Sequence, residues 1–170
     1  VPVTVAGGLT DVESVRSGGS FTCALLNSGE VKCWGRNDYG QLGNGTTTNQ
    51  LTPVSVSGGL NDAIELSTGS SHACVVLESG LVKCWGRNLT SQLGDGTSTD
   101  RNSPVSVAGG LSQVINLSLG NSHSCAVLEN GQVKCWGSNS YGALGDGTST
   151  TRNTPVLVQG GLANIVSTSV

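Results

Sequence analysis

Six cysteines are the most reactive side chains of this sequence, and they form three pairs with the same internal spacing. The pairs are Cys23 with Cys33, Cys74 with Cys84, and Cys125 with Cys135. Paired thiols form disulfides or bind a metal, and a tetrahedral zinc site needs four ligands. Only His72 and His123 are available to complete such sites. We therefore expect three disulfides and no metal, and disulfides persist in an oxidising compartment.

The histidines and the loop aspartates are the other candidates for chemistry. No nucleophile with an orienting carboxylate recurs at a triad-like spacing from His72 or His123, so we expect each imidazole to form a structural hydrogen bond. Asp95-Gly96-Thr97 and Asp146-Gly147-Thr148 lack the alternating carboxylates of a calcium loop, and the first copy has Asn44 instead of Asp. We expect turns there, no cofactor, and no enzymatic activity.

Each cysteine pair encloses a segment that has the pattern of a β-hairpin. The two halves of the first one meet at Asn27-Ser28-Gly29. If these residues form a three-residue loop whose glycine is left-handed, Cys23 lies directly opposite Cys33. Opposed residues of a non-hydrogen-bonded antiparallel pair have Cα atoms roughly 4.5 Å apart, within reach of a disulfide. The hairpin thus positions the two thiols for a bond.

The hairpin belongs to a repeat with a period of 51 residues. Its markers include the tryptophans that follow the hairpins, Trp34, Trp85 and Trp136, and the prolines Pro2, Pro53, Pro104 and Pro155. We treat the chain as one array, 1–170, with units 2–52, 53–103 and 104–154 and a partial fourth unit, 155–170. Both ends of the chain therefore carry the same part of the repeat.

The residue pattern of each unit predicts short strands and turns but no amphipathic helix. In the second unit we expect strands at 53–56, 63–67, 72–77 and 81–86. Four short antiparallel strands in about 50 residues are typical of a β-propeller blade, which buries its faces by stacking on neighbouring blades. The predicted fold class is all-β.

Composition and charge exclude several classes of partner. The chain has a net charge of −3 and 8 Lys and Arg residues in 170, which recur singly, so a nucleic-acid partner is not expected. No apolar run approaches the roughly 18 residues that a membrane span needs. The opening Val-Pro-Val indicates a mature or internal segment. Together with the cysteines, this predicts a secreted or cell-surface protein.

The residues after each hairpin form a composite signature. The first copy, from Trp34 to Thr46, is Trp-Gly-Arg-Asn-Asp-Tyr-Gly-Gln-Leu-Gly-Asn-Gly-Thr, and the third copy has Ala143 in place of Gln. The signature resembles that of the regulator of chromosome condensation (RCC) repeat family, and the match covers nearly the whole chain. Family members look like seven-bladed propellers, so the resemblance implies one blade per unit. Three and a third units do not close a ring of that size.

Departures from the family pattern bear on function. Phe21 replaces the His found at positions 72 and 123, and Ser91 replaces a Gly. The cysteine pairs are not part of the general pattern and suggest a secreted, disulfide-bearing variant. The best-known member exchanges nucleotide on a small nuclear GTPase, but that activity depends on one protein's surface and does not follow from the fold. Secreted bacterial members that inhibit an enzyme look like protein-binding modules, which suits this chain better.

We assign roles to the remaining candidates by position in the repeat. The residues expected to pack between blades are Trp34, Trp85, Trp136, His72 and His123. The possible interaction residues, at positions where the repeats differ, are Arg36, Asp38, Tyr39, Arg87, Leu89, Tyr141 and Asp100. The glycosylation sequons begin at Asn44, Asn88 and Asn116, and we expect few of them to be used.

The leading hypothesis is a non-enzymatic extracellular propeller-type module that binds a protein partner, or a copy of itself, through blade loops and open edges. The alternative is a structural subunit of an extracellular filament or surface layer, built by head-to-tail assembly of repeats. An enzyme is the weakest reading, because no acid–base pair stands out.

Overall fold

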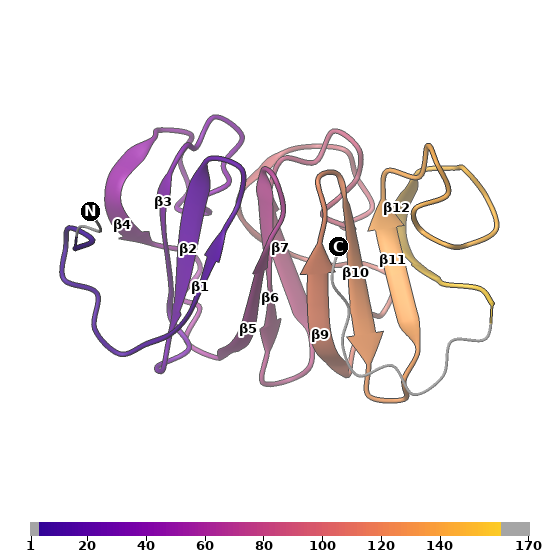
Figure 1. Cartoon of the computed structure of the whole chain (residues 1–170), viewed down its shortest axis with the longest axis horizontal. Helices are drawn as coiled ribbons and strands as arrows, with labels where there is room; N and C mark the ends of the chain where they lie inside the picture. The colour runs from indigo at the N-terminus through magenta and orange to yellow at the C-terminus, as the bar shows by residue number, and fades with distance from the viewer. Residues whose placement is uncertain (1–3, 161–170) are drawn as a thin grey trace.

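The computed structural model describes residues 4–160 and contains three four-stranded antiparallel sheets that follow one another along the long axis of the molecule (Figure 1). The first sheet consists of β1 (Val12–Ser17), β2 (Phe21–Leu26), β3 (Val31–Gly35) and β4 (Gln50–Ser55). The second consists of β5 (Ala63–Thr68), β6 (His72–Leu77), β7 (Val82–Gly86) and β8 (Arg101–Ser106). The third consists of β9 (Val114–Leu119), β10 (His123–Leu128), β11 (Val133–Gly137) and β12 (Arg152–Leu157). The predicted all-β class is confirmed, and the three blades do not close into a ring.

The central hairpin of each blade has the register expected from its three-residue loop. Cys23 on β2 lies opposite Cys33 on β3, and Leu26 N donates to Glu30 O across the loop. Gly29 has φ of +77°, a left-handed conformation that other residues adopt only with strain. Disulfides join Cys23 to Cys33, Cys74 to Cys84 and Cys125 to Cys135. All six cysteines are buried.

The outer strand of each blade spans the boundary between two sequence units. β4 pairs with β3, and Pro53, the residue that opens the second unit, lies inside β4 rather than at the first position of a strand. Proline is tolerated there because β4 is the last strand of its sheet and needs no donor on its outer side. The strands of the first blade therefore span residues 12–55. In the third blade, β12 includes residues 155–157 of the partial fourth unit. Residues 161–170 of that unit lie outside the described residues.

The apolar core lies mainly between the blades. One buried cluster joins Leu25 and Leu42 of the first blade to Leu66 and Trp85 of the second. A second cluster joins the second blade to the third in the same way. Blade stacking is thus the main source of apolar burial, as the repeat predicts. The described residues include no helix that is long and apolar enough to cross a membrane.

Candidate interaction surface

The loops that follow the tryptophans form one face of the molecule, and each is held by a buried asparagine. These signature loops span 36–49, 87–100 and 138–151, and their anchors are Asn37, Asn88 and Asn139. Asn88 Nδ2 lies 3.1 Å from Asp95 Oδ1 and donates to the carbonyls of Thr97 and Thr99, while its Oδ1 accepts from Leu93 N over 3.0 Å. Asn37 and Asn139 make the same set of contacts in their own loops. These hydrogen bonds therefore hold the backbone of each signature loop in a rigid conformation.

The aspartates of the signature loops are structural. Thr148 Oγ1 donates to Asp146 Oδ1 over 2.7 Å, and Arg152 Nε donates to Asp146 Oδ2 over 2.7 Å. The hydrogen bond from Thr148, supported by Arg152 and by Asn139, lowers the pKa of Asp146 to about 2. Asp95 has the corresponding contacts with Thr97 and Arg101. Within residues 4–160, no group of three His, Cys, Asp or Glu side chains is placed to hold a metal ion.

The predicted interaction residues occupy different environments. Arg36 and Asp38 are exposed and paired, with Nε and Oδ2 2.6 Å apart, and Leu89 is exposed at the corresponding place in the next loop. Tyr141 is fully exposed. Asp100 belongs to the scaffold instead, because its Oδ1 accepts from Asn88 N over 2.6 Å.

A cation–π contact crosses the boundary between the first two blades. The guanidinium of Arg87 lies 4.9 Å from the ring centroid of Tyr39, and that of Arg36 lies 5.8 Å away on the same blade as the ring. Both predicted residues, Tyr39 and Arg87, are therefore partly engaged within the molecule. A guanidinium over an aromatic face contributes roughly 0.5–1 kcal/mol at an exposed site.

The sequons differ in accessibility. Asn88 is fully buried, and its amide nitrogen is the loop anchor. A glycan on Asn88 Nδ2 would displace the hydrogen bonds that this nitrogen donates within the loop. Asn44 and Asn116 are half-buried and hydrogen-bonded to Asn37 and Glu65, respectively.

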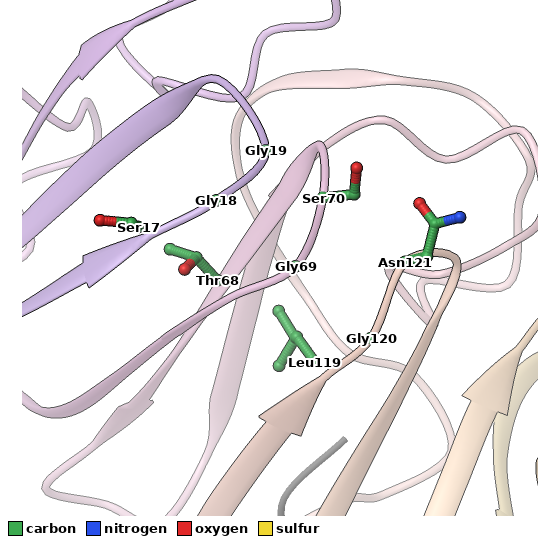
Figure 2. A pocket seen from close by; sticks show the side chains of 9 residues that line it. All are labelled: Ser17, Gly18, Gly19, Thr68, Gly69, Ser70, Leu119, Gly120 and Asn121. Carbon is green, nitrogen blue, oxygen red and sulfur yellow. The ribbon is translucent and has the colours of Figure 1, made fainter.

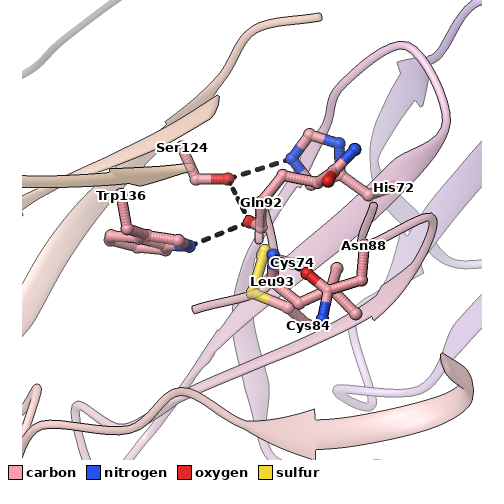
Figure 3. Close-up of a disulfide and its surroundings, with 8 residues drawn as sticks. All are labelled: His72, Cys74, Cys84, Asn88, Gln92, Leu93, Ser124 and Trp136. Carbon is pink, nitrogen blue, oxygen red and sulfur yellow. Dashed lines mark hydrogen bonds between the residues drawn. A yellow bond between two sulfur atoms is a disulfide. The ribbon is translucent and has the colours of Figure 1, made fainter. Parts of the chain in front are cut away.

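Three of the predicted packing residues, Trp85, Trp136 and His72, lie at boundaries between blades, and Figure 3 shows the boundary between the second and third blades. Trp136 Nε1 of the third blade donates to the carbonyl of Gln92 of the second over 2.9 Å. Trp85 Nε1 makes the corresponding bond to Gln41 O over 3.0 Å. Both indoles are fully buried, whereas Trp34 of the first blade is only half-buried. The tryptophans therefore tie each blade to the one before it, and Trp34 has its preceding side open within the described chain.

His72 and Ser124 form a buried polar pair across the same boundary (Figure 3). Ser124 Oγ donates its proton to Gln92 O over 2.8 Å, so the 2.9 Å contact with His72 requires that His72 Nε2 carry a hydrogen. Complete burial, reinforced by the charge of His123, lowers the pKa of His72 to about 3. The imidazole is therefore neutral at physiological pH. His123 is half-buried, and desolvation lowers its pKa as well.

A shallow hollow of about 360 Å³ lies where the inner turns of the three blades meet (Figure 2). Its lining is mostly backbone from the turns 18–19, 69–70 and 120–121, with Ser17, Thr68 and Leu119 beside them. Gly18 and Gly69 keep the neighbouring turns in close contact, since a Cβ on either would lie within 3 Å of the next blade's backbone. None of these lining residues has a charged side chain.

Sequence reasoning missed the loop anchors and the hydroxyl partner of His72. The anchors had a signal, because an asparagine stands at the same place in all three signature copies. Ser124 had none, since the equivalent residues are Thr22 and Ala73. The partner of Ser124, His72, lies on the neighbouring blade, one repeat position before that of Ser124.

Two family models with the description "Regulator of chromosome condensation (RCC1) repeat" match the sequence. One matches residues 28–76, 79–127 and 130–170. The other matches 12–41, 63–92 and 114–143.

Relatives resemble the chain over most of its length. The human E3 ubiquitin-protein ligase HERC2 is 36% identical over 155 residues, which cover 86% of this chain and 3% of the ligase. The ultraviolet-B receptor UVR8 of Arabidopsis thaliana is 35% identical over 148 residues, covering 85% of this chain and 33% of the receptor. The chain therefore spans a third or less of these relatives.

Solved structures resemble the blades. Human WBSCR16 superimposes with a TM-score of 0.78 at 27% identity, over 87% of this chain and 38% of that one. Yeast RCC1 (Prp20), in its crystal structure bound to Kap60, also gives 0.78, at 21% identity over 90% of this chain and 38% of that one. The second likeness shows the shared fold alone.

Proposed function

Because this chain belongs to the regulator of chromosome condensation (RCC1) repeat family, we propose that it is a non-enzymatic extracellular module that binds a protein partner or a copy of itself. Blades of this family typically serve as protein-interaction modules. Our proposal adds the place of action and the surfaces used, namely the signature loops and the open edges of the blade array.

The observation that carries the proposal is the contrast within each signature loop. The anchoring asparagines are identical in all three blades and buried. The exposed positions next to them vary, with Arg36 and Asp38 in the first loop and Leu89 in the second. A rigid loop that presents variable side chains suits recognition, because little conformational entropy is lost when a partner binds. The three disulfides support an oxidising, extracellular setting.

The test exchanges residues between the repeats. Asp38→Ser and Leu89→Ser give the first two loops the serine that the third has at position 140. Proteins cross-linked to the wild-type chain in the extracellular fluid of its source are identified, purified and titrated against both forms. We expect one of the cross-linked proteins to bind the double variant at least tenfold more weakly than it binds the wild-type chain. The thermal stability of the double variant should equal that of the wild type.

Leu81 provides the matched control, because it is exposed on the hairpin end opposite the signature loops. Leu81→Ser should leave partner binding unchanged. The proposal of loop-mediated recognition is wrong if every bound protein is held equally by the wild-type chain and the loop variant.

Self-assembly is the second candidate, and a specific observation favours it. On one side of the first blade, apolar residues are exposed whose equivalents in the other two blades are buried. A head-to-tail contact through that side would produce either a ring or a filament.

A further inference from the structure

The three sequons place their amide nitrogens in different surroundings. N-glycosylation bonds a sugar to the side-chain nitrogen Nδ2 of the asparagine in an Asn-x-Ser or Asn-x-Thr sequence. Nδ2 carries two hydrogens, and the glycosidic bond replaces one of them. A folded sequon therefore accommodates a glycan only where Nδ2 is accessible and has a hydrogen that the fold does not use. This criterion separates Asn44, Asn88 and Asn116, the sequons of the chain.

Asn88 has no spare hydrogen on its Nδ2. The side chain is fully buried. Its Nδ2 donates to Asp95 Oδ1 over 3.1 Å and to the carbonyls of Thr97 and Thr99 over 3.2 Å and 3.1 Å. Two hydrogens serve these three acceptors, so a sugar on Nδ2 would remove a donor from the anchor of the second signature loop. We therefore expect no glycan at Asn88 in the folded protein.

Asn116 uses its Nδ2 to join two blades. From β9 of the third blade, it donates to Oε1 of Glu65, on β5 of the second blade, over 3.0 Å. The same oxygen accepts from Leu117 N over 3.0 Å. Within residues 4–160, Glu65 Oε2 is buried and has no hydrogen-bond partner, so the carboxylate depends on the donors at Oε1. Ser118, which completes the sequon, is also buried. A sugar on Asn116 would lie against the contact between these two blades.

Asn44 differs from both, because its Nδ2 is accessible and unused. Its Oδ1 accepts from Asn37 Nδ2 over 3.2 Å, and from the backbone nitrogen and the hydroxyl of Thr46 over 3.1 Å and 2.8 Å. An atom with these three donors is the amide oxygen, so Nδ2 is the opposite atom of the amide. In the described part of the chain, Asn44 Nδ2 makes no hydrogen bond and is not buried. Residues 45–49 beside it are exposed.

Two differences between the repeats uncover this nitrogen. In the second loop the equivalent residue is Asp95, whose Oδ2 accepts from Arg101 Nε over 2.9 Å, and the side chain of Asp95 is only 5% exposed. The first blade has Gln50 in place of the arginine. Gln50 Nε2 donates to Thr48 O over 3.4 Å instead. Because the arginine that covers Asp95 belongs to the same blade, the accessibility of Asn44 Nδ2 is a property of the first blade alone.

The neighbouring blade is already in place beside Asn44. Gly45 N donates to Asn102 O over 2.8 Å, and Asn102 Nδ2 donates to Gly45 O over 3.0 Å. A Cβ on Gly43 would lie 2.8 Å from the indole of Trp85. The second blade therefore packs closely against the residues on both sides of Asn44 while Nδ2 stays accessible.

We propose that Asn44 is an N-glycosylation site and that Asn88 and Asn116 are not. The sugar donor is an oligosaccharide joined to a lipid through pyrophosphate, and a transferase of the secretory pathway catalyses the step. The bond from sugar C1 to the pyrophosphate oxygen breaks, and its electron pair leaves with the lipid pyrophosphate. The bond from Nδ2 to C1 forms, and Nδ2 releases one proton to a base of the transferase. The proposal rests on the extracellular part of the proposed function.

The test supplies the secretory route, so its result does not depend on where the chain acts. The 170-residue chain is expressed in a eukaryotic cell behind a cleavable secretion signal, and the folded, secreted protein is analysed by mass spectrometry of intact glycopeptides. We expect a glycan on Asn44 in most molecules and none on Asn88 or Asn116. Asn44→Gln should remove the modification. Folded, secreted chain that lacks a glycan at Asn44, or carries one at Asn88 or Asn116, overturns the proposal and leaves the partner-binding test of the proposed function untouched.

Matched exchanges between the first two loops test the cause. Asn44→Asp with Gln50→Arg gives the first loop the residues of the second, and it should abolish the glycan without changing the circular dichroism spectrum. Asp95→Asn with Arg101→Gln makes the reverse change and should add a glycan at position 95. A folded, secreted reverse variant without that glycan would contradict the role of the arginine as a cover.

Enzymatic removal tests the accessibility of the site in the folded protein. A peptide N-glycosidase should release the glycan at Asn44 without denaturation and leave an aspartate, the residue that the other two loops have at this position. The melting temperature should then match that of the untreated protein. Release that requires unfolding would show that Nδ2 is enclosed by the fold, against the proposal.

Discussion

His72 Nε2 lies 2.9 Å from Ser124 Oγ, and this hydrogen bond joins two blades at positions that differ by 52 residues in the sequence. In the contact between the first two blades, Phe21 and Ala73 occupy the same two places. The fold therefore accepts either a polar or an apolar pair at one site, and the polar pair introduces a titratable group into the core.

The buried imidazole makes stability depend on pH. Unfolded histidine titrates near 6.5, whereas burial lowers the pKa of His72 to about 3. Below pH 6.5 the unfolded state takes up a proton that the native state refuses, so stability falls as the pH drops from 6.5 towards 3. At pH 5 we expect a loss of about 2 kcal/mol from this group, measured by urea unfolding at pH 7.5 and pH 5.

The variant His72→Phe with Ser124→Ala gives the second contact the residues of the first. It should fold at neutral pH and lose about 2 kcal/mol less than the wild type between pH 7.5 and pH 5. His123 remains in both proteins, so its own titration cancels in the comparison. An equal loss in the two proteins would show that His72 is not the group responsible.

The sequence predicted the parts of the fold that depend on local order. The loop Asn27-Ser28-Gly29 determines that Cys23 faces Cys33, and a constant period requires identical blades. The hydroxyl partner of His72 depends instead on how adjacent blades are offset, which no local pattern records. Likewise, the sequon at Asn88 is a correct local pattern, but the amide is consumed by long-range loop contacts.

The loop anchor Asn88 should be far more important to stability than its exposed neighbour. Asn88→Ala removes several hydrogen bonds and leaves the Leu93 N–H without its acceptor inside the protein. Leaving buried polar groups unpaired costs roughly 1–3 kcal/mol each, so we expect a loss of at least about 3 kcal/mol. Leu89→Ala, at the next position, should change stability by no more than about 0.5 kcal/mol. Chemical denaturation of both variants decides the matter, and similar losses would contradict the anchoring role.

Gly94 and Gly96 separate two reasons for glycine in one loop. Both have positive φ, +68° and +83°. A Cβ on Gly96 meets nothing within 4 Å, so Gly96→Ala should cost only the backbone strain, about 1–2 kcal/mol. Gly94→Ala should cost a further 1–3 kcal/mol or so, because the indole of Trp136 must move. Near-ultraviolet circular dichroism should change for Gly94→Ala alone; equal spectra and stabilities would argue against close indole packing.

The disulfides should stabilise the blades without any help from metal. Each closes a loop with a sequence separation of 10, for which chain entropy predicts on the order of 2–3 kcal/mol. Cys74→Ala with Cys84→Ala should lose at least that much, because both sulfurs are buried in the core between the second and third blades and their removal also leaves a cavity. Thermal unfolding should show a lower midpoint for this variant and for the reduced wild type. A chelator alone should change nothing; a chelator-sensitive midpoint that is indifferent to reduction would mean that the thiols hold a metal.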